Sequence, residues 1–81
     1  MTWTIAALYQ FSRFDAPDAI KPALVSLGKT HGISGTLLLA REGINGTISG
    51  PQAGIEAMIA HIRTLPGCAD LAPKYSHAAE Q

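Results

Sequence analysis

The chain has 81 residues, of which 47% are hydrophobic and 15% are charged, and its six basic and six acidic residues give a formal net charge of zero. A chain of this length buries one hydrophobic core, and its composition is far from that of disordered proteins, which argues for a single folded domain. The neutral charge argues against a strong independent nucleic-acid binder, because phosphate binding depends on a cationic excess. Any contact with RNA would then be local, or shared with another domain.

Cysteine and histidine usage limits the redox and metal chemistry of the chain. Cys68 is its only cysteine, so an internal disulfide and a cysteine-rich zinc site are excluded, and we expect a reducing cytoplasmic location. His31, His61 and His77 are far apart in the sequence, and we expect no metal site and no cofactor in this domain. The longest apolar run, residues 37–40, is far shorter than the roughly 20 residues of a membrane span, so we expect no membrane contact.

The first predicted element is a strand over residues 3–11. Its side chains alternate between two sets, the first with Trp3, Ile5, Ala7, Tyr9 and Phe11 and the second with Thr4, Ala6, Leu8 and Gln10. This two-residue period is typical of a strand, and the small or apolar second set predicts that both faces are largely covered. We therefore expect a central strand, followed by a loop over residues 12–18.

Apolar positions predict a helix from about residue 19 to residue 31. They form one stripe at helical spacing, with Ile20, Leu24, Leu27 and His31. Pro22 should lie in the first turn, or separate a short turn from the main helix, because a proline inside a helix costs about 3 kcal/mol. Gly32 should end the helix in the left-handed conformation.

Residues 34–41 form the second predicted strand, whose apolar side chains show no alternation, as expected when both faces are covered. A third strand over residues 44–49 returns beside it, so the two form a hairpin. The reversal fits Glu42-Gly43, because glycine reaches positive φ without steric cost. The pair Asn45-Gly46 is also a strong turn signal, so the reversal could instead lie two residues later, or Gly46 could be a bulge in the returning strand.

A second helix is predicted over residues 51–65, with Pro51 at its first position. Its buried stripe comprises Ile55, Met58, Ile59, Ile62 and Leu65. A short fourth strand is predicted within residues 70–77, and Pro73 confines it to a sheet edge because proline lacks a backbone donor.

This order of elements is that of the α+β ferredoxin-like (acylphosphatase-like) βαββαβ sandwich, an antiparallel sheet with two helices on one face. We expect the spatial strand order 4-1-3-2, which makes strand 34–41 an edge strand. An apolar edge strand attracts partners, so we expect a neighbouring domain or subunit to cover it.

The hairpin brings a cation, a carboxylate and an amide together, in Arg41, Glu42 and Asn45. Such a group is able to bind a phosphate or a nucleotide edge, with the backbone amides of Gly43 and Gly46 also available to an anion. The alternative interpretation is that the glycines and Asn45 only shape the turn and that the two charged side chains are solvated.

Arg13 is a weaker phosphate candidate. It lies in the loop where an acyl-phosphate hydrolase resembling acylphosphatase would hold its phosphate, but the run Gln10-Phe-Ser-Arg13 has no glycine to bring backbone amides onto the ligand. Cys68 has no basic neighbour closer than Arg63, so we expect it to be a small buried apolar group.

The run Gly35-Thr-Leu-Leu-Leu-Ala-Arg-Glu-Gly-Ile-Asn-Gly-Thr-Ile-Ser-Gly50 resembles the signature of the rhodanese-related tRNA uridine hydroxylase family, and Ala7-Leu-Tyr-Gln-Phe11 extends the match. The resemblance implies an acylphosphatase-like N-terminal domain over residues 1–77. Residues 78–81 would then lead to a rhodanese domain outside this sequence. In that family the rhodanese domain carries the active-site cysteine, so Cys68 does not replace it, and the whole protein converts the wobble uridine of certain tRNAs to 5-hydroxyuridine with oxygen.

The resemblance implies an accessory domain that is not catalytic alone. Its role would be to position tRNA or to pack on the rhodanese domain, with Arg41, Glu42, Asn45 and Thr47 facing that partner. Two alternatives remain: an acylphosphatase-like hydrolase that uses Arg13 with Asn45, and a purely structural domain. The cofactor that activates oxygen in the full-length protein is not implied by these residues.

Overall fold

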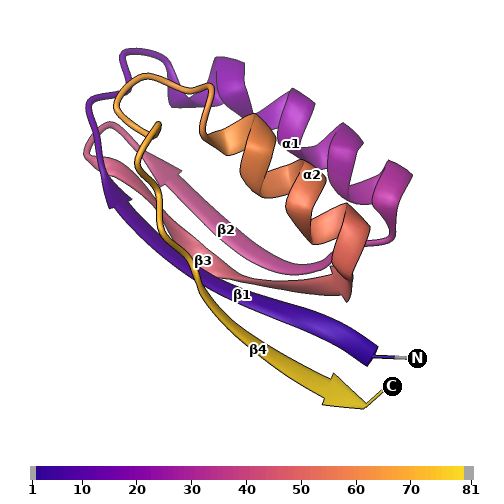
Figure 1. Ribbon diagram of the computed structural model, residues 1–81. Helices are drawn as coiled ribbons and strands as arrows, with labels where there is room; N and C mark the ends of the chain where they lie inside the picture. Colours follow the sequence, from indigo (N-terminus) through magenta and orange to yellow (C-terminus); the bar gives the residue numbers. More distant parts are fainter. Residues whose placement is uncertain (1, 80–81) are drawn as a thin grey trace.

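Residues 2–79 form one antiparallel sheet of four strands with two helices on one face (Figure 1). The computed structural model describes residues 2–79. The elements are β1 (Thr2–Phe11), α1 (Pro17–His31), β2 (Ser34–Ala40), β3 (Gly43–Pro51), α2 (Gln52–Ile62) and β4 (Lys74–Ala79). The strand order β2-β3-β1-β4 confirms the predicted ferredoxin-like (acylphosphatase-like) α+β fold and the central position of β1.

Only one face of β1 lies in the core, so the prediction that both faces are covered was wrong. Ala6 and Leu8 point toward the helices and are 0% and 5% exposed, whereas Tyr9 and Phe11 on the other face are 61% and 70% exposed. Both helices pack on the face that carries Ala6 and Leu8, so the set with the smaller side chains is the buried one. The aromatic set lies on the face that no helix among residues 2–79 covers, which we call the open face (Figure 1).

The helix α1 begins at Pro17, earlier than predicted, and Pro22 lies inside it rather than in its first turn. The hydrogen bond that Pro22 cannot donate would go to the carbonyl of Asp18, and both residues are exposed, so water can bond that carbonyl instead. Gly32 ends the helix as predicted, with φ 66°, and its N–H donates to the carbonyl of Gly28.

The helix α2 presents the predicted buried stripe to the sheet, with Ile55, Met58, Ile59 and Ile62. It is shorter than predicted at both ends. Pro51 is the last residue of β3 and precedes the helix, and Leu65 lies beyond the helix but is still packed against the core.

The hairpin reverses at Arg41 and Glu42, because Ala40 pairs with Gly43. The turn therefore lies one residue before the predicted position. The later position is excluded, and so is a bulge at Gly46, because β3 pairs in unbroken register with β2 on one side and β1 on the other.

Both outer strands differ in part from the prediction. Leu38 of β2 is 60% exposed, so within residues 2–79 this edge strand is not covered on both faces. The fourth strand begins at Lys74, directly after Pro73, and lies at a sheet edge as predicted. Leu71 precedes it and is buried in the core. The strand β4 runs to Ala79, past the predicted domain limit at residue 77, and residues 80–81 lie outside the described part of the chain.

Neither helix of the described residues is long and apolar enough to cross a membrane.

Candidate functional site

Two backbone hydrogen bonds join the β1–α1 loop to the hairpin turn. The N–H of Ser12 donates to the carbonyl of Glu42 and the N–H of Phe14 donates to the carbonyl of Arg41, both at 3.0 Å. The loop and the turn therefore lie side by side at one end of the sheet, which we call the hairpin end (Figure 1). Arg13, between the two donors, is held next to the turn, and its side chain is exposed like those of Arg41 and Glu42.

The same two bonds bear on phosphate binding. An acylphosphatase-like site needs backbone amides that point at the ligand, and the amides on either side of Arg13 already donate to the hairpin. Asn45 lies within β3, where its neighbours place it on the open face of the sheet rather than in the loop with Arg13. The arrangement thus gives little support to a hydrolase that uses Arg13 with Asn45.

The open face carries the polar side chains that follow the turn. Asn45 pairs with Tyr9 of β1 and with Leu38 of β2, so these three side chains form one row across the sheet. Thr47 lies in the next row, which it shares with other small side chains. Both Asn45 and Thr47 are exposed, as a contact role requires.

Tyr9 and Phe11 form an aromatic pair on this face. Their ring centroids are 5.0 Å apart and the ring planes meet at 77°, the edge-to-face arrangement that aromatic quadrupoles favour. A depression of about 200 Å³ lies beside them at the hairpin end, lined by Tyr9, Gln10, Phe11, Leu38, Ala40, Glu42, Gly43, Ile44 and Asn45. The site thus combines aromatic faces, an amide and a turn with one charge of each sign.

The aromatic part of this site does not follow from the sequence pattern. That pattern predicts Tyr9, Phe11 and Leu38 as covered positions, because the residues that alternate with them are also apolar or small. The one available signal was size: a strand under two closely packed helices favours small residues such as Ala6, which leaves the aromatic set for the other face.

The two glycines of the predicted site, Gly43 and Gly46, are required by the backbone geometry of β3. Gly43 and Gly46 have φ of 149° and 152°, values that side chains with a Cβ rarely adopt. A Cβ at Gly43 would collide with the carbonyl oxygen of Gln10, and one at Gly46 would collide with that of Thr36. Gly43 therefore lets β3 approach β1, and Gly46 lets it approach β2.

Cys68 lies in the core, as predicted, and is 0% exposed. Burial raises the pKa of its thiol, an effect that a hydrogen bond with the Ser12 side chain only partly opposes. Because the thiolate is the reactive form, we expect Ellman's reagent at pH 8 to modify the folded chain at least about 1,000-fold more slowly than the chain unfolded in urea. A reaction in buffer at the rate of a free thiol would show that Cys68 is accessible.

Among residues 2–79, no cluster of three or more His, Cys, Asp or Glu side chains is placed to hold a metal ion. The three histidines lie on α1, α2 and β4.

Comparison with known proteins relates this fold and hairpin to one group of sequences. The model of the UPF0176 acylphosphatase like domain matches residues 3–81. The chain is 60% identical over 77 residues, 95% of its length, to a tRNA uridine(34) hydroxylase of Caulobacter vibrioides (strain NA1000 / CB15N). It is 62% identical over 64 residues, 79% of its length, to the protein of that name from Roseobacter denitrificans. It is 46% identical over 80 residues, 99% of its length, to the one from Brucella anthropi.

These matches cover only part of each relative: 24% of the Caulobacter protein, 22% of the Roseobacter protein and 26% of the Brucella protein. The chain thus spans about a quarter of the length of the curated relatives that it matches. With the βαββαβ order, the predicted strand order and a family model that matches nearly the whole sequence, this chain belongs to the UPF0176 acylphosphatase-like domain family.

Proposed function

We propose that this chain is the accessory N-terminal domain of a tRNA uridine hydroxylase and that its open face, at the hairpin end, contacts unpaired bases of the tRNA. The observation that carries the proposal is the exposed Tyr9–Phe11 pair beside Asn45. The substrate class comes from the relatives, which are named tRNA uridine(34) hydroxylases.

The chemistry of this face suits single-stranded RNA. Unpaired bases stack on exposed aromatic rings and offer their edges to amide side chains, and a four-stranded sheet with exposed aromatic side chains is a common platform for this contact. Tyr9 and Phe11 provide the rings, and the Asn45 amide provides both a donor and an acceptor. Stacking needs no excess of positive charge, which agrees with the formal net charge of zero.

The domain is proposed to act with the rest of the enzyme. Among the described residues, Arg13 and Arg41 are the two cations of the β1–α1 loop and the hairpin turn, so we expect few phosphate contacts from this part of the domain. The remaining contacts, and the chemistry at the uridine, would come from the rhodanese domain of the longer protein. Packing of the hairpin end on that rhodanese domain is the second role that we propose for Arg41, Glu42 and Thr47.

Titration of the ¹⁵N-labelled chain with a tRNA anticodon stem-loop that carries U34 tests the RNA contact. We expect amide shifts at Tyr9, Phe11, Leu38 and Asn45, and we expect the Tyr9→Ala and Phe11→Ala variants to bind about 5- to 150-fold more weakly each, since one base stacked on an aromatic ring contributes about 1–3 kcal/mol. Because few phosphates are contacted, the slope of log K against log salt should be no steeper than about −2.

Tyr75→Ala is the matched control, because Tyr75 is also exposed, at 48%, but pairs with Ala6 and so lies on the opposite face of the sheet. Its loss should leave binding unchanged. If the stem-loop produces no shifts on the open face while the full-length enzyme binds tRNA, the RNA contact is wrong and packing on the rhodanese domain is the surviving role.

A further inference from the structure

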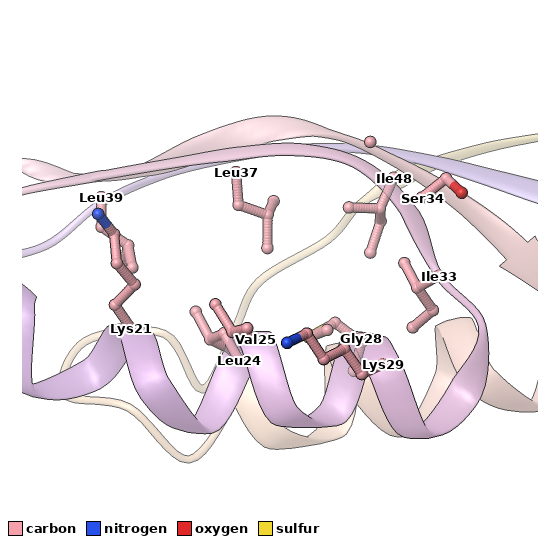
Figure 2. A pocket seen from close by; sticks show the side chains of 12 residues that line it. Lys21, Leu24, Val25, Gly28, Lys29, Ile33, Ser34, Leu37, Leu39 and Ile48 are labelled. Carbon is pink, nitrogen blue, oxygen red and sulfur yellow. The ribbon is translucent and has the colours of Figure 1, made fainter.

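A groove of about 520 Å³ runs between α1 and the edge strand β2, on the helix side of the sheet and away from the open face. Figure 2 shows its walls: Leu24 and Val25 rise from the helix, and Leu37, Leu39 and Ile48 come from the sheet to meet them. These side chains are apolar, so a ligand that fills the groove must present apolar groups to them.

Two lysines of α1 line this groove, and none of its lining residues is acidic. Lys21 lies at the Leu39 end of the view and Lys29 nearer its Ile33 end (Figure 2). Lys29 comes eight residues after Lys21, which is a rise of about 12 Å along the helix axis. Asp18 is one turn before Lys21 and does not line the groove. The lining is therefore complementary to a ligand with negative charges toward the two ends of the groove and an apolar group between them.

The groove lies along a free strand edge. In the sheet formed by residues 2–79, β2 pairs with β3 alone, so the N–H and C=O groups of its outer edge have no strand beside them. A strand edge of this kind pairs readily with an extended peptide, which receives main-chain hydrogen bonds from it. The helix α1 beside it would contact every second side chain of that peptide.

We propose that an extended acidic segment of a partner protein binds here as a fifth strand beside β2. The spacing of its charges follows from the backbone geometry: residues i and i+4 of a strand lie about 13 Å apart on one face, close to the rise of about 12 Å along α1 from Lys21 to Lys29. The segment has the pattern acid-x-apolar-x-acid. Its two carboxylates meet the lysines, and the apolar side chain between them enters the groove beside Leu24 and Leu37.

A second copy of this chain does not fit the same groove. The strand β2 has the sequence Ser-Gly-Thr-Leu-Leu-Leu-Ala, which holds no carboxylate. Pairing of two β2 edges would bring the lysines of both copies to one seam, and the paired strands would supply no carboxylate to them, so like charges would repel there.

The probe for this proposal is the blocked peptide acetyl-Thr-Glu-Thr-Val-Thr-Glu-Thr-amide, titrated into the ¹⁵N-labelled chain. We expect saturable shifts at residues 34–40 and in the facing side of α1. The double variant Lys21→Glu with Lys29→Glu should bind at least about tenfold more weakly, and the peptide with lysine in place of both glutamates should not bind. Lys74→Glu, which reverses the remaining lysine of the chain on the opposite sheet edge, should leave binding unchanged.

Backbone methylation of the peptide separates strand addition from simple charge attraction. In a strand, alternate N–H groups point to opposite sides, so N-methylation at one alternate set of residues should abolish binding and at the other set should not. The proposal is overturned if the peptide gives no saturable shifts, if the charge reversals leave affinity unchanged, or if both methylated peptides bind equally. Shifts centred on Tyr9, or dimerisation of the chain through β2 in sedimentation, would also overturn it.

Discussion

The Gly46→Ala variant is expected to lose about 4 kcal/mol or more of unfolding free energy, as measured by urea denaturation. Two costs add at this position. The φ of 152° is strained for any residue with a Cβ, and that Cβ would collide with the Thr36 carbonyl oxygen across the β2–β3 pair. An 81-residue domain has about 4–12 kcal/mol of stability, so this change leaves it close to unfolding.

The same substitution at two other glycines provides the controls. Gly32 also has a positive φ, 66°, but nothing lies within 4 Å of a Cβ there, so Gly32→Ala should cost only about 1–2 kcal/mol. Gly28 lies inside α1, and a Cβ there would make an ordinary 3.9 Å contact with the Cε of Met58. Gly28→Ala should therefore stabilise the chain by about 0.5–1 kcal/mol. Equal effects at all three glycines would contradict this account of β3.

The Phe14→Ala variant should lose about 3–5 kcal/mol, the usual cost of removing a phenylalanine from a core. Phe14 is 2% exposed and belongs to the core cluster, although it lies in a loop. Its N–H also donates to the Arg41 carbonyl, so the loss of its side chain should loosen the β1–α1 loop against the hairpin turn. Urea denaturation gives the free energy, and amide exchange at Phe14 gives the local loosening.

Phe11 is the matched control, because the chain has only two phenylalanines and Phe11 is 70% exposed. Phe11→Ala should cost at most about 1 kcal/mol, which is the aromatic contact with Tyr9. The two variants together test which side chains of this region lie in the core. If Phe11→Ala proved the more damaging of the two, the aromatic face of β1 would be the buried one, and the proposed RNA contact would lose its basis.

The positions of the candidate site residues follow only in part from the sequence. Arg41, Glu42, Asn45 and Thr47 are exposed at or beside the hairpin, where their spacing after an apolar strand placed them. Their aromatic neighbours were not found, because Tyr9 is next to Asn45 only through the pairing of β1 with β3. That pairing joins positions far apart in the sequence, and no local pattern specifies it.

The sequence by itself determined the order of the elements, the buried stripe of α2 and the helix end at Gly32, because each follows from a local periodicity or a single residue's backbone freedom. Only the tertiary structure decided which face of β1 is buried, since both of its alternating sets are apolar or small. The buried face is the one on which the two helices pack. The tertiary structure also decided the turn. Asn45-Gly46 is a strong local turn signal, but a turn there would interrupt the pairing of β3 with both of its neighbours. The unbroken pairing stabilises the fold more than the local turn preference does, so the chain reverses at Arg41 and Glu42.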